Sequence, residues 1–350
     1  MVQKIIECLE DDKHRRIGIY GNGGIGKTIV IKALFSAPEI KDKFDFFIQV
    51  TISRYWSRKK IQLEIARQIE LSMEDIQSAD ELASINLESH SRLVVATRSV
   101  HICKNVASDR QIEVGALSWK KAWNLFQEQV EGVINSPSVR PRAEVIVSEC
   151  GGLPLMIIVI GKALATEIDV SGWRLVMSNL LSVTGLESGD IDEALFQKLK
   201  VGYDKLHDYD LKCCFLYCVL FPEDHNIEII ELINYWIQEG LVTGNSADAS
   251  RKGFRIVRHL IEASLVEPVD GVSIKMHDLI RDLASWIILS EEGSLDFLVG
   301  RKFNKVRNQE LMLEPRTISI AKSPQKLPRV ENCLLSKAGA GLLLPPEESE

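Results

Sequence analysis

The stretch that decides the fold is Gly21-Asn22-Gly23-Gly24-Ile25-Gly26-Lys27-Thr28, which follows the apolar run Arg16–Tyr20 and precedes a helical segment. It matches the pattern G-x-x-x-x-G-K-[ST] in full. Glycines let backbone N–H groups turn inward around an anion, the lysine reaches the outer phosphates, and the threonine hydroxyl holds Mg²⁺. In this setting the motif predicts a Walker A phosphate-binding loop and a purine-nucleotide site, rather than an ordinary glycine-rich turn.

Apolar strands alternate with helices over the first third of the chain. The predicted strands are Arg16–Tyr20, Phe46–Val50, Leu93–Ala96 and Ile112–Val114, and the predicted helices are 2–10, 27–35 and 57–69. This alternation predicts a parallel, doubly wound α/β sheet with helices on both faces, the architecture of P-loop NTPases.

After Gly115 the pattern becomes helical. Helices are predicted from Ser118 and at 143–149, 154–165, 172–181 and 191–201, then in a group at 209–264. A strand pair near Val266 and at 273–275, followed by a helix at 277–287, predicts a winged-helix unit. The predicted domains are 1–115 (nucleotide-binding), 116–203 (all-α helical), 204–290 (winged-helix) and 291–350 (linker).

Composition and charge narrow the functional classes. The 350 residues are 45% hydrophobic and 26% charged, with a net charge of −7, which favours a soluble globular protein over a nucleic-acid or membrane-surface binder. Three of the seven cysteines, Cys213, Cys214 and Cys218, are crowded together. A metal or redox site is one reading; the lack of a second zinc-spaced pair favours buried, reduced thiols and a cytoplasmic location. No secretory signal or transmembrane segment is evident.

One expected element of a hydrolysing P-loop enzyme is missing. Such an enzyme needs an acidic residue at the end of a second apolar strand, to orient Mg²⁺ and water. The stretch Glu74–Ser91 is polar, and Asp75 follows a helical segment. The sequence therefore predicts nucleotide binding with poor hydrolysis.

Six ordered motifs over about residues 15–290 carry a family resemblance. Besides the phosphate loop they are Phe44–Ser53, Ser91–Ser99, Gly152-Leu153-Pro154-Leu155, Cys214–Asp224 and Met276-His277-Asp278. In these motifs the chain resembles the NB-ARC switch module of plant nucleotide-binding, leucine-rich-repeat disease-resistance proteins of the coiled-coil class.

The resemblance implies ADP, ATP and Mg²⁺ as ligands, with ADP holding a closed state and ATP permitting assembly. It implies that Arg98 senses the outer phosphate, that Pro154 packs on adenine and that His277 reaches the ADP phosphates. Together with these three residues, the implied nucleotide-binding set comprises Gly21, Asn22, Gly23, Gly24, Ile25, Gly26, Lys27 and Thr28, with Thr28 on Mg²⁺. Each has a local alternative: a surface ion pair for Arg98, a first helical turn for Pro154, a helix N-terminus for His277. The block Cys214–Asp224 is expected to pack the helical domain on the winged-helix unit.

Three departures from the family stand out. The strand that ends in paired aspartates is missing between Ile69 and Arg92. By resemblance it should lie between Phe46–Val50 and Leu93–Ala96, so we expect its loss to leave Phe46–Val50 without ladder partners. Neither the adenine-closing segment with its coiled coil nor a repeat array is expected in this chain. A family threonine is replaced by Ile29, with a minor expected effect.

Three functions remain open. The first is a disease-resistance switch that binds nucleotide, with other resistance-protein domains or effector-guarded host proteins as partners. The second is a truncated, non-catalytic paralogue acting as adaptor or decoy, or a non-functional relic. The third is a DNA-binding regulator, which the excess of Asp and Glu over Lys and Arg in residues 204–290 disfavours.

Overall fold

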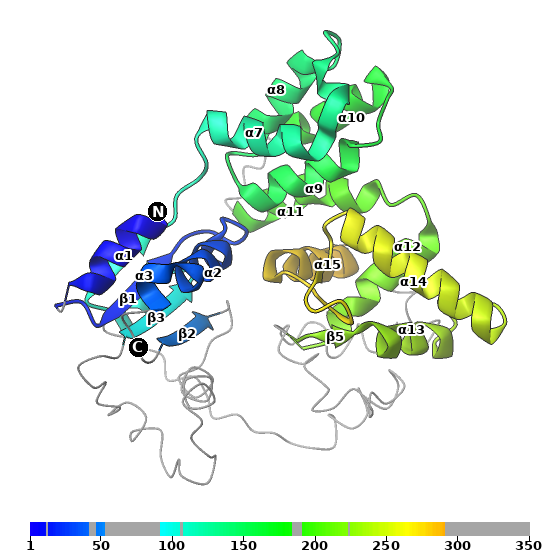
Figure 1. Ribbon diagram of the computed structural model, residues 1–350. Coiled ribbons are helices and arrows are strands. Elements are labelled where there is room, and N and C mark those ends of the chain that lie inside the picture. Colours follow the sequence, from blue (N-terminus) through cyan, green and yellow to red (C-terminus); the bar gives the residue numbers. More distant parts are fainter. Residues whose placement is uncertain are drawn as a thin grey trace. The chain divides into compact units, whose positions relative to one another are not determined.

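The structure divides into two compact units. The computed structural model describes residues 1–11, 13–41, 47–52, 92–105, 108–183, 191–222 and 225–290. One unit comprises Met1–Leu125 with Cys150–Ile157, and the other Phe126–Glu149 with the chain from Ile158 onward. We call them the sheet unit and the helical unit, and Figure 1 labels their elements. Among the described helices, none is both long and apolar enough to cross a bilayer.

The sheet unit follows the predicted alternation. Its elements are α1 (Val2–Glu10), β1 (Arg16–Tyr20), α2 (Lys27–Ser36), α3 (Pro38–Lys41), β2 (Phe47–Ile52), β3 (Arg92–Thr97), α6 (Val100–Asn105), β4 (Arg110–Glu113) and the first turns of α7 (Trp119–Val130). The limits of β1 are those predicted, and the other described strands lie within two residues of their predicted positions. The predicted helix at 57–69 lies outside the described residues.

All strand pairs in this sheet are parallel, in the order β2-β3-β1-β4. The expectation that strand Phe46–Val50 would lack ladder partners is wrong. Strand β2 pairs directly with β3 over its whole length, from Phe47 opposite Arg92 to Ile52 opposite Thr97. The sheet closes across the place where the resemblance put another strand, because any parallel neighbour in register can satisfy the same backbone groups.

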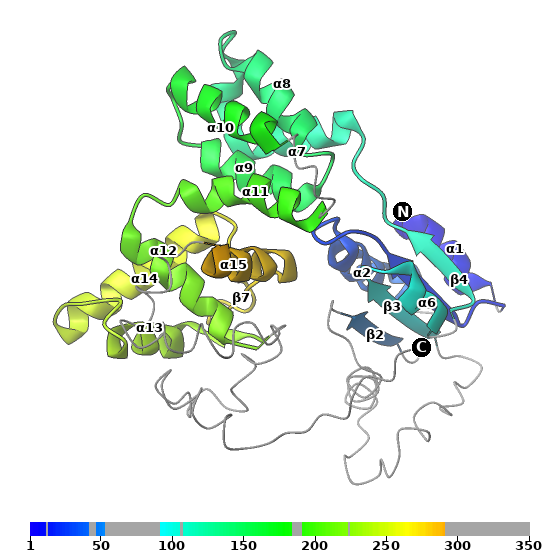
Figure 2. The same ribbon diagram turned by 180° about the vertical axis from the view of Figure 1, so that it is seen from behind.

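Helices cover both faces of the sheet. Helix α2 lies on one face in Figure 1, and α6 lies on the opposite face in Figure 2. The crossover from β1 to β2 and the crossover from β3 to β4 run in opposite directions along the sheet, and right-handed crossovers of opposite direction place their helices on opposite faces. Asp109 fixes the start of β1, because its carboxylate accepts the backbone amides of Arg15 and Arg16, each at 2.8 Å.

The helical unit contains the rest of the described elements. These are the last turns of α7, η1 (Glu131–Asn135), α8 (Arg140–Glu149), most of α9 (Pro154–Leu164), α10 (Val170–Ser182), α11 (Ile191–Asp204), α12 (Tyr209–Tyr217), η3 (Cys218–Leu220), β5 (Ile227–Glu228), α13 (Ile229–Gln238), α14 (Ser246–Glu262), β6 (Glu267–Pro268), β7 (Ser273–Lys275) and α15 (Asp278–Ser290). The short strands pair antiparallel in the order β5-β7-β6, so the predicted hairpin is present and gains a third strand.

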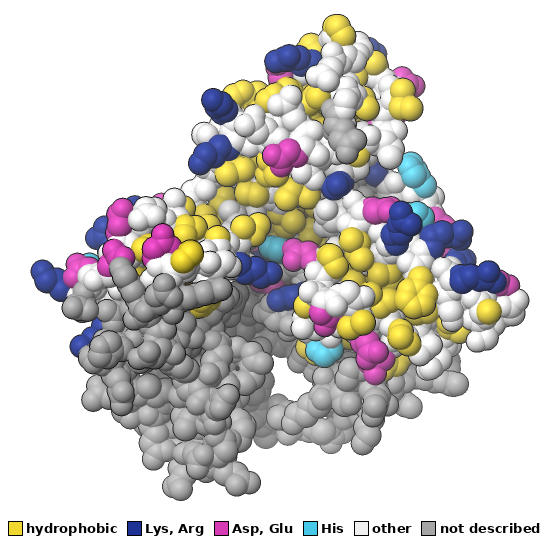
Figure 3. All heavy atoms as spheres, viewed as in Figure 1, with side chains coloured by type: hydrophobic (Ala, Val, Ile, Leu, Met, Phe, Trp, Pro, Cys, Tyr) yellow, Lys and Arg dark blue, Asp and Glu magenta, His cyan; other side chains and the backbone are white. Residues whose placement is uncertain are grey.

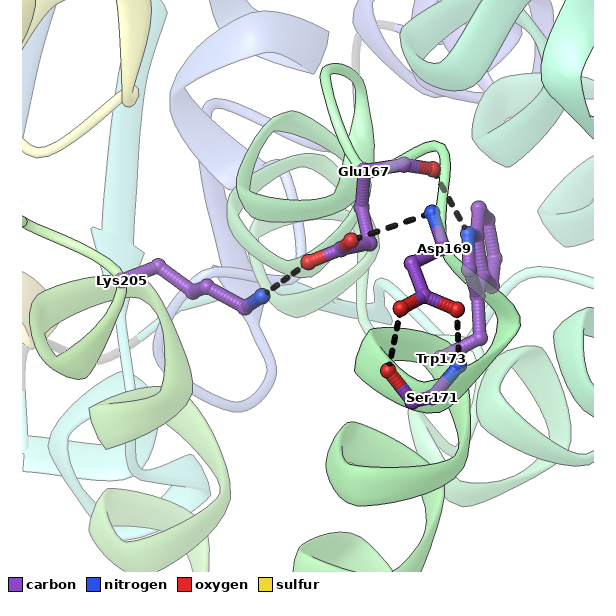
Figure 4. Close-up of polar contacts among 5 residues, drawn as sticks. All are labelled: Glu167, Asp169, Ser171, Trp173 and Lys205. Atoms are coloured by element: carbon purple, nitrogen blue, oxygen red, sulfur yellow. Dashed lines mark hydrogen bonds and ion pairs between the residues drawn. The ribbon is translucent and has the colours of Figure 1, made fainter.

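A polar cluster holds the turn between α9 and α10 (Figure 4). Asp169 caps α10, because its carboxylate accepts the amide of Ser171 at 3.0 Å and the hydroxyl at 2.8 Å. The buried Trp173 donates its indole N–H to the Glu167 carbonyl at 3.0 Å and meets Phe126 edge to face. The Glu167 carboxylate pairs with Lys205 just beyond α11, at 2.6 Å.

Helix α11 is held on two sides. On one side, Lys198 pairs with Glu149 at the end of α8 at 2.8 Å, and Lys205 pairs with Glu167. Residues seven apart lie on the same face of a helix, so both ion pairs act on one face. On another side, Phe196 packs against Trp286 of α15. Helix α11 therefore joins the all-α helices to the winged-helix elements.

The ion pair of Glu167 predicts a pH dependence of stability. The hydrogen bond from Lys205, opposed in part by desolvation, holds the pKa of Glu167 below its ordinary value. A lowered folded-state pKa contributes stability that is complete above the unfolded-state pKa and is lost as pH falls through the folded-state value. We expect Glu167→Gln to lower the urea midpoint at pH 7, and the difference from wild type to shrink below about pH 4. A difference in urea midpoint between Glu167→Gln and wild type that is the same at pH 7 and below about pH 4 would contradict this account.

Candidate nucleotide-binding site

The phosphate loop, Gly21–Thr28, joins β1 to α2 with a backbone that only its glycines adopt easily. Gly24 has a φ of 70°, and Gly26, the N-cap of α2, has a φ of 94°. In the left-handed region a side chain is strained, and glycine has none. The first-turn amides of α2 and the helix dipole both favour an anion at this end of the helix. The loop thus has the conformation and polarity that a polyphosphate requires.

Lys27 lies within the loop rather than out in solvent. Its ammonium donates to the carbonyls of Gly21 at 2.7 Å and Asn22 at 2.8 Å. These bonds direct two loop carbonyls toward the cation, and they hold a positive charge at the mouth of an anion-binding turn. The donor set fits a nucleotide di- or triphosphate, which supplies the matching negative charge.

Strand register brings Arg98 to the same edge of the sheet. Tyr20, the last residue of β1, pairs with Thr97, the last residue of β3. Neighbouring parallel strands lie about 4.8 Å apart. Gly21 and Arg98, which directly follow the paired residues Tyr20 and Thr97, are therefore close to each other in the backbone. Ligands of open α/β sheets bind at these carboxyl ends. Arg98 is half-buried there.

The glycine-leucine-proline-leucine motif meets the loop directly. Pro154 is the first residue of α9, and the next amide, that of Leu155, donates to the carbonyl of Gly24 at 3.2 Å. Pro154 therefore lies beside the loop crest. The structure brings together the loop, Arg98 and Pro154, three of the four parts of the predicted set.

The first turn of α2 carries the remaining predicted loop contacts. Thr28 is exposed, so its hydroxyl is accessible to a Mg²⁺ ion that a nucleotide would bring. Ile29, which replaces a family threonine, is 64% exposed and takes no part in the core. The minor effect expected of this replacement stays a prediction.

His277 belongs to the helical unit and caps α15. Its ring Nδ1 accepts the amide of Leu279 at 3.1 Å, and its carbonyl accepts the amide of Arg281 at 2.9 Å. With Nδ1 accepting, a neutral ring carries its hydrogen on Nε2. The local alternative for His277 is therefore present in the structure. A role toward nucleotide remains a prediction.

The crowded cysteines are buried thiols. Cys213, Cys214 and Cys218 are at most 4% exposed, and the described part of the chain holds no group of three His, Cys, Asp or Glu that suits a metal ion. Burial raises the pKa of Cys213 to about 12 and that of Cys218 to about 12, and it also raises the pKa of Cys214. Protonated, enclosed thiols are poor nucleophiles, and the core reading favoured from the sequence is confirmed.

Three basic side chains of helix α14 are paired with acids. On α14, Arg251 pairs with Asp248, Arg258 with Glu262 at 2.8 Å, and Lys252 with Asp210 of α12. Figure 3 shows Lys and Arg interleaved with Asp and Glu over this region. A duplex-binding helix instead presents cations to phosphates, so the DNA-binding reading gains no support.

Two family models match the chain. Residues 1–87 match the NB-ARC domain, and residues 220–284 match the disease resistance protein winged helix domain. The chain is thus similar to NB-ARC disease-resistance proteins in these two regions. The NB-ARC match contains the phosphate loop, and the winged-helix match contains His277.

Curated relatives are similar to this chain over nearly its whole length. A probable disease resistance protein of Arabidopsis thaliana is 30% identical over 98% of this chain and 41% of its own length. Another Arabidopsis disease resistance protein is 31% identical over 91% of this chain and 36% of its own. The chain spans about two fifths of the length of these relatives. A solved signal transduction ATPase with numerous domains from Pyrococcus horikoshii, with a tetratricopeptide repeat sensor, shows 15% identity and a TM-score of 0.48 over 91% of this chain and 46% of its own.

Two features beside the phosphate loop were not assigned a role from the sequence. One is Gly152, whose left-handed turn places the start of α9; the pair Gly151-Gly152 before a proline was the available signal. The other is the connecting segment, Val114–Leu117, which runs from β4 toward α7 and bonds to both the end of β1 and Gly152. No residue type in that segment indicates its position.

The cap formed by His277 generates a stability prediction. Replacement by alanine removes the acceptor for the Leu279 amide, and we expect His277→Ala to lower the unfolding free energy by about 1 kcal/mol. His277→Asn supplies another good capping oxygen and should restore most of this loss. Urea unfolding followed by circular dichroism measures both. Equal stability of the alanine variant and wild type would show that the cap contributes nothing.

Proposed function

We propose that this chain is a nucleotide-dependent switch of plant disease resistance, which binds ADP or ATP with Mg²⁺ through Gly21–Thr28. The similarity to disease-resistance proteins gives the disease-resistance context. The observation that carries nucleotide binding is the loop itself, with left-handed Gly24 and Gly26 at the start of α2 and the Lys27 ammonium on the loop carbonyls.

The surrounding residues fit defined parts of a nucleotide. Arg98, at the end of the strand beside β1, is suited to the outer phosphate. Pro154, beside Gly24, offers an apolar ring and is suited to the base. His277 would contribute its Nε2–H from the winged-helix elements. In this proposal, ADP stabilises one arrangement of the chain and ATP another, because the two nucleotides differ in the phosphate that Arg98 would contact.

Binding is tested by ligand-induced stabilisation. We expect ADP at about 100 times its Kd to raise the unfolding free energy by about 2.7 kcal/mol, seen as a higher melting temperature. Lys27→Ala should abolish the shift. Lys32→Ala, on the exposed side of the same helix, is the matched control and should keep it. A wild-type chain that ignores millimolar ADP and ATP would eliminate the switch function.

Hydrolysis is a separate prediction. The hydrogen-bonded pair β2–β3 has no strand between its members, so it offers no strand end for an acid between them. A Mg²⁺-orienting carboxylate at that place is what P-loop hydrolysis normally uses. We expect wild type to show no Mg²⁺-dependent ATPase above the Lys27→Ala background. Turnover that disappears in Lys27→Ala would contradict this expectation and leave nucleotide binding intact.

A further inference from the structure

Three backbone hydrogen bonds join the end of β1, the connecting segment, the motif Gly152–Leu155 and the phosphate loop. The Val114 amide donates to the carbonyl of Tyr20 at 2.8 Å, just before the loop. The Leu117 amide donates to Gly152 at 2.9 Å, and the Leu155 amide donates to Gly24 at 3.2 Å. The bonds form a closed path from β1 through the connecting segment to the motif Gly152–Leu155 and back to the loop crest.

The bond to Gly24 bears on anion binding. When loop amides turn inward toward a phosphate, the carbonyls of the same peptides turn outward and need donors of their own. Leu155 supplies one: as the second residue of α9, it has no helical partner for its amide, and Pro154 before it has no N–H at all. The Leu155 amide therefore stabilises the loop in the conformation that receives a phosphate.

Two glycines allow the connecting segment to lie close. A Cβ on Gly152 would lie 2.5 Å from the Leu117 carbonyl oxygen, and one on Gly21 would lie 2.6 Å from that of Val114. Neighbouring Gly151 also has a positive φ, of 56°, yet a Cβ there would meet nothing within 4 Å. Close packing of backbone on backbone thus requires glycine at position 152 for a reason that does not hold at 151.

We propose that Gly152 is a positioning residue of the nucleotide site: through Leu117 on one side and Leu155 on the other, it sets the phosphate loop in its anion-binding conformation. The inference rests on the proposed nucleotide binding and adds a device that controls its phosphate side. The role proposed for Gly152, on the phosphate side of the nucleotide, differs from that of Pro154, which is proposed to contact the base.

The test compares Gly152→Ala with Gly151→Ala in the full chain. Both variants place alanine in the left-handed region, so both carry that strain, and only the first collides with Leu117. The readout is the ratio of the Kd for AMP to the Kd for ADP, measured by calorimetry, which reports the contribution of the outer phosphate. We expect the ratio to fall by about tenfold in Gly152→Ala, with the AMP affinity little changed, and to stay at the wild-type value in Gly151→Ala.

The outcomes are distinct. Equal losses for AMP and ADP in Gly152→Ala would place the effect on the nucleoside side and overturn the inference, and so would an unchanged ratio. Absence of ADP binding by wild type would overturn the proposed function and the inference with it. If Gly152→Ala does not fold, hydrogen exchange of wild type decides: ADP should slow exchange at the Leu117 and Leu155 amides, and unchanged rates at both would contradict the inference.

Discussion

The position of β1 between two parallel neighbours is the constraint on which the site depends. Hydrogen bonds to β3 on one side and β4 on the other fix its register. Because parallel strands end at a common edge, this register alone brings the phosphate loop, Arg98 and the connecting segment together. A slip of one residue would turn the strand over and bring Ile17 or Ile19 to the face where a Cβ at Gly18 would lie 2.6 Å from the Cys103 sulfur, so packing and site geometry are fixed by the same pairing.

The limits of helices and strands were predicted best where the sequence carries a clear signal at both ends of the element. Strand β1 was bounded correctly because an apolar run ends at a glycine loop. Helix α10 was predicted to start at Gly172 and starts at Val170, because the capping role of Asp169 was not recognised. Helix α8 starts at Arg140 rather than Ala143, since proline at 141 is tolerated in a first turn. These errors come from local features that compete with hydrophobic periodicity.

The site was predictable in its residues and not in its connections. The loop, Arg98 and Pro154 were identified from motifs, and strand register then explains their proximity. The role of Gly152 depends on Leu117, 35 positions earlier in the chain, and such a contact follows only from the fold. The direct β2–β3 pairing was likewise out of reach, because the expectation assumed that a strand keeps the partner its relatives give it. Backbone N–H and C=O groups can pair with any strand in register, so β2 can pair with β3.

The three hydrogen bonds that join the end of β1, the connecting segment, the motif Gly152–Leu155 and the phosphate loop are all between main-chain atoms. The residues at Val114, Leu117 and Leu155 can therefore change to any type except proline, which lacks the N–H, without removing one of the three bonds. Among the residues of these bonds and close approaches, natural selection would be strict at Gly21 and Gly152, where a Cβ would collide, and permissive at Val114, Leu117 and Leu155. Homologues that share only 30% of their residues with this chain could thus retain the same internal architecture around a nucleotide through long periods of sequence drift.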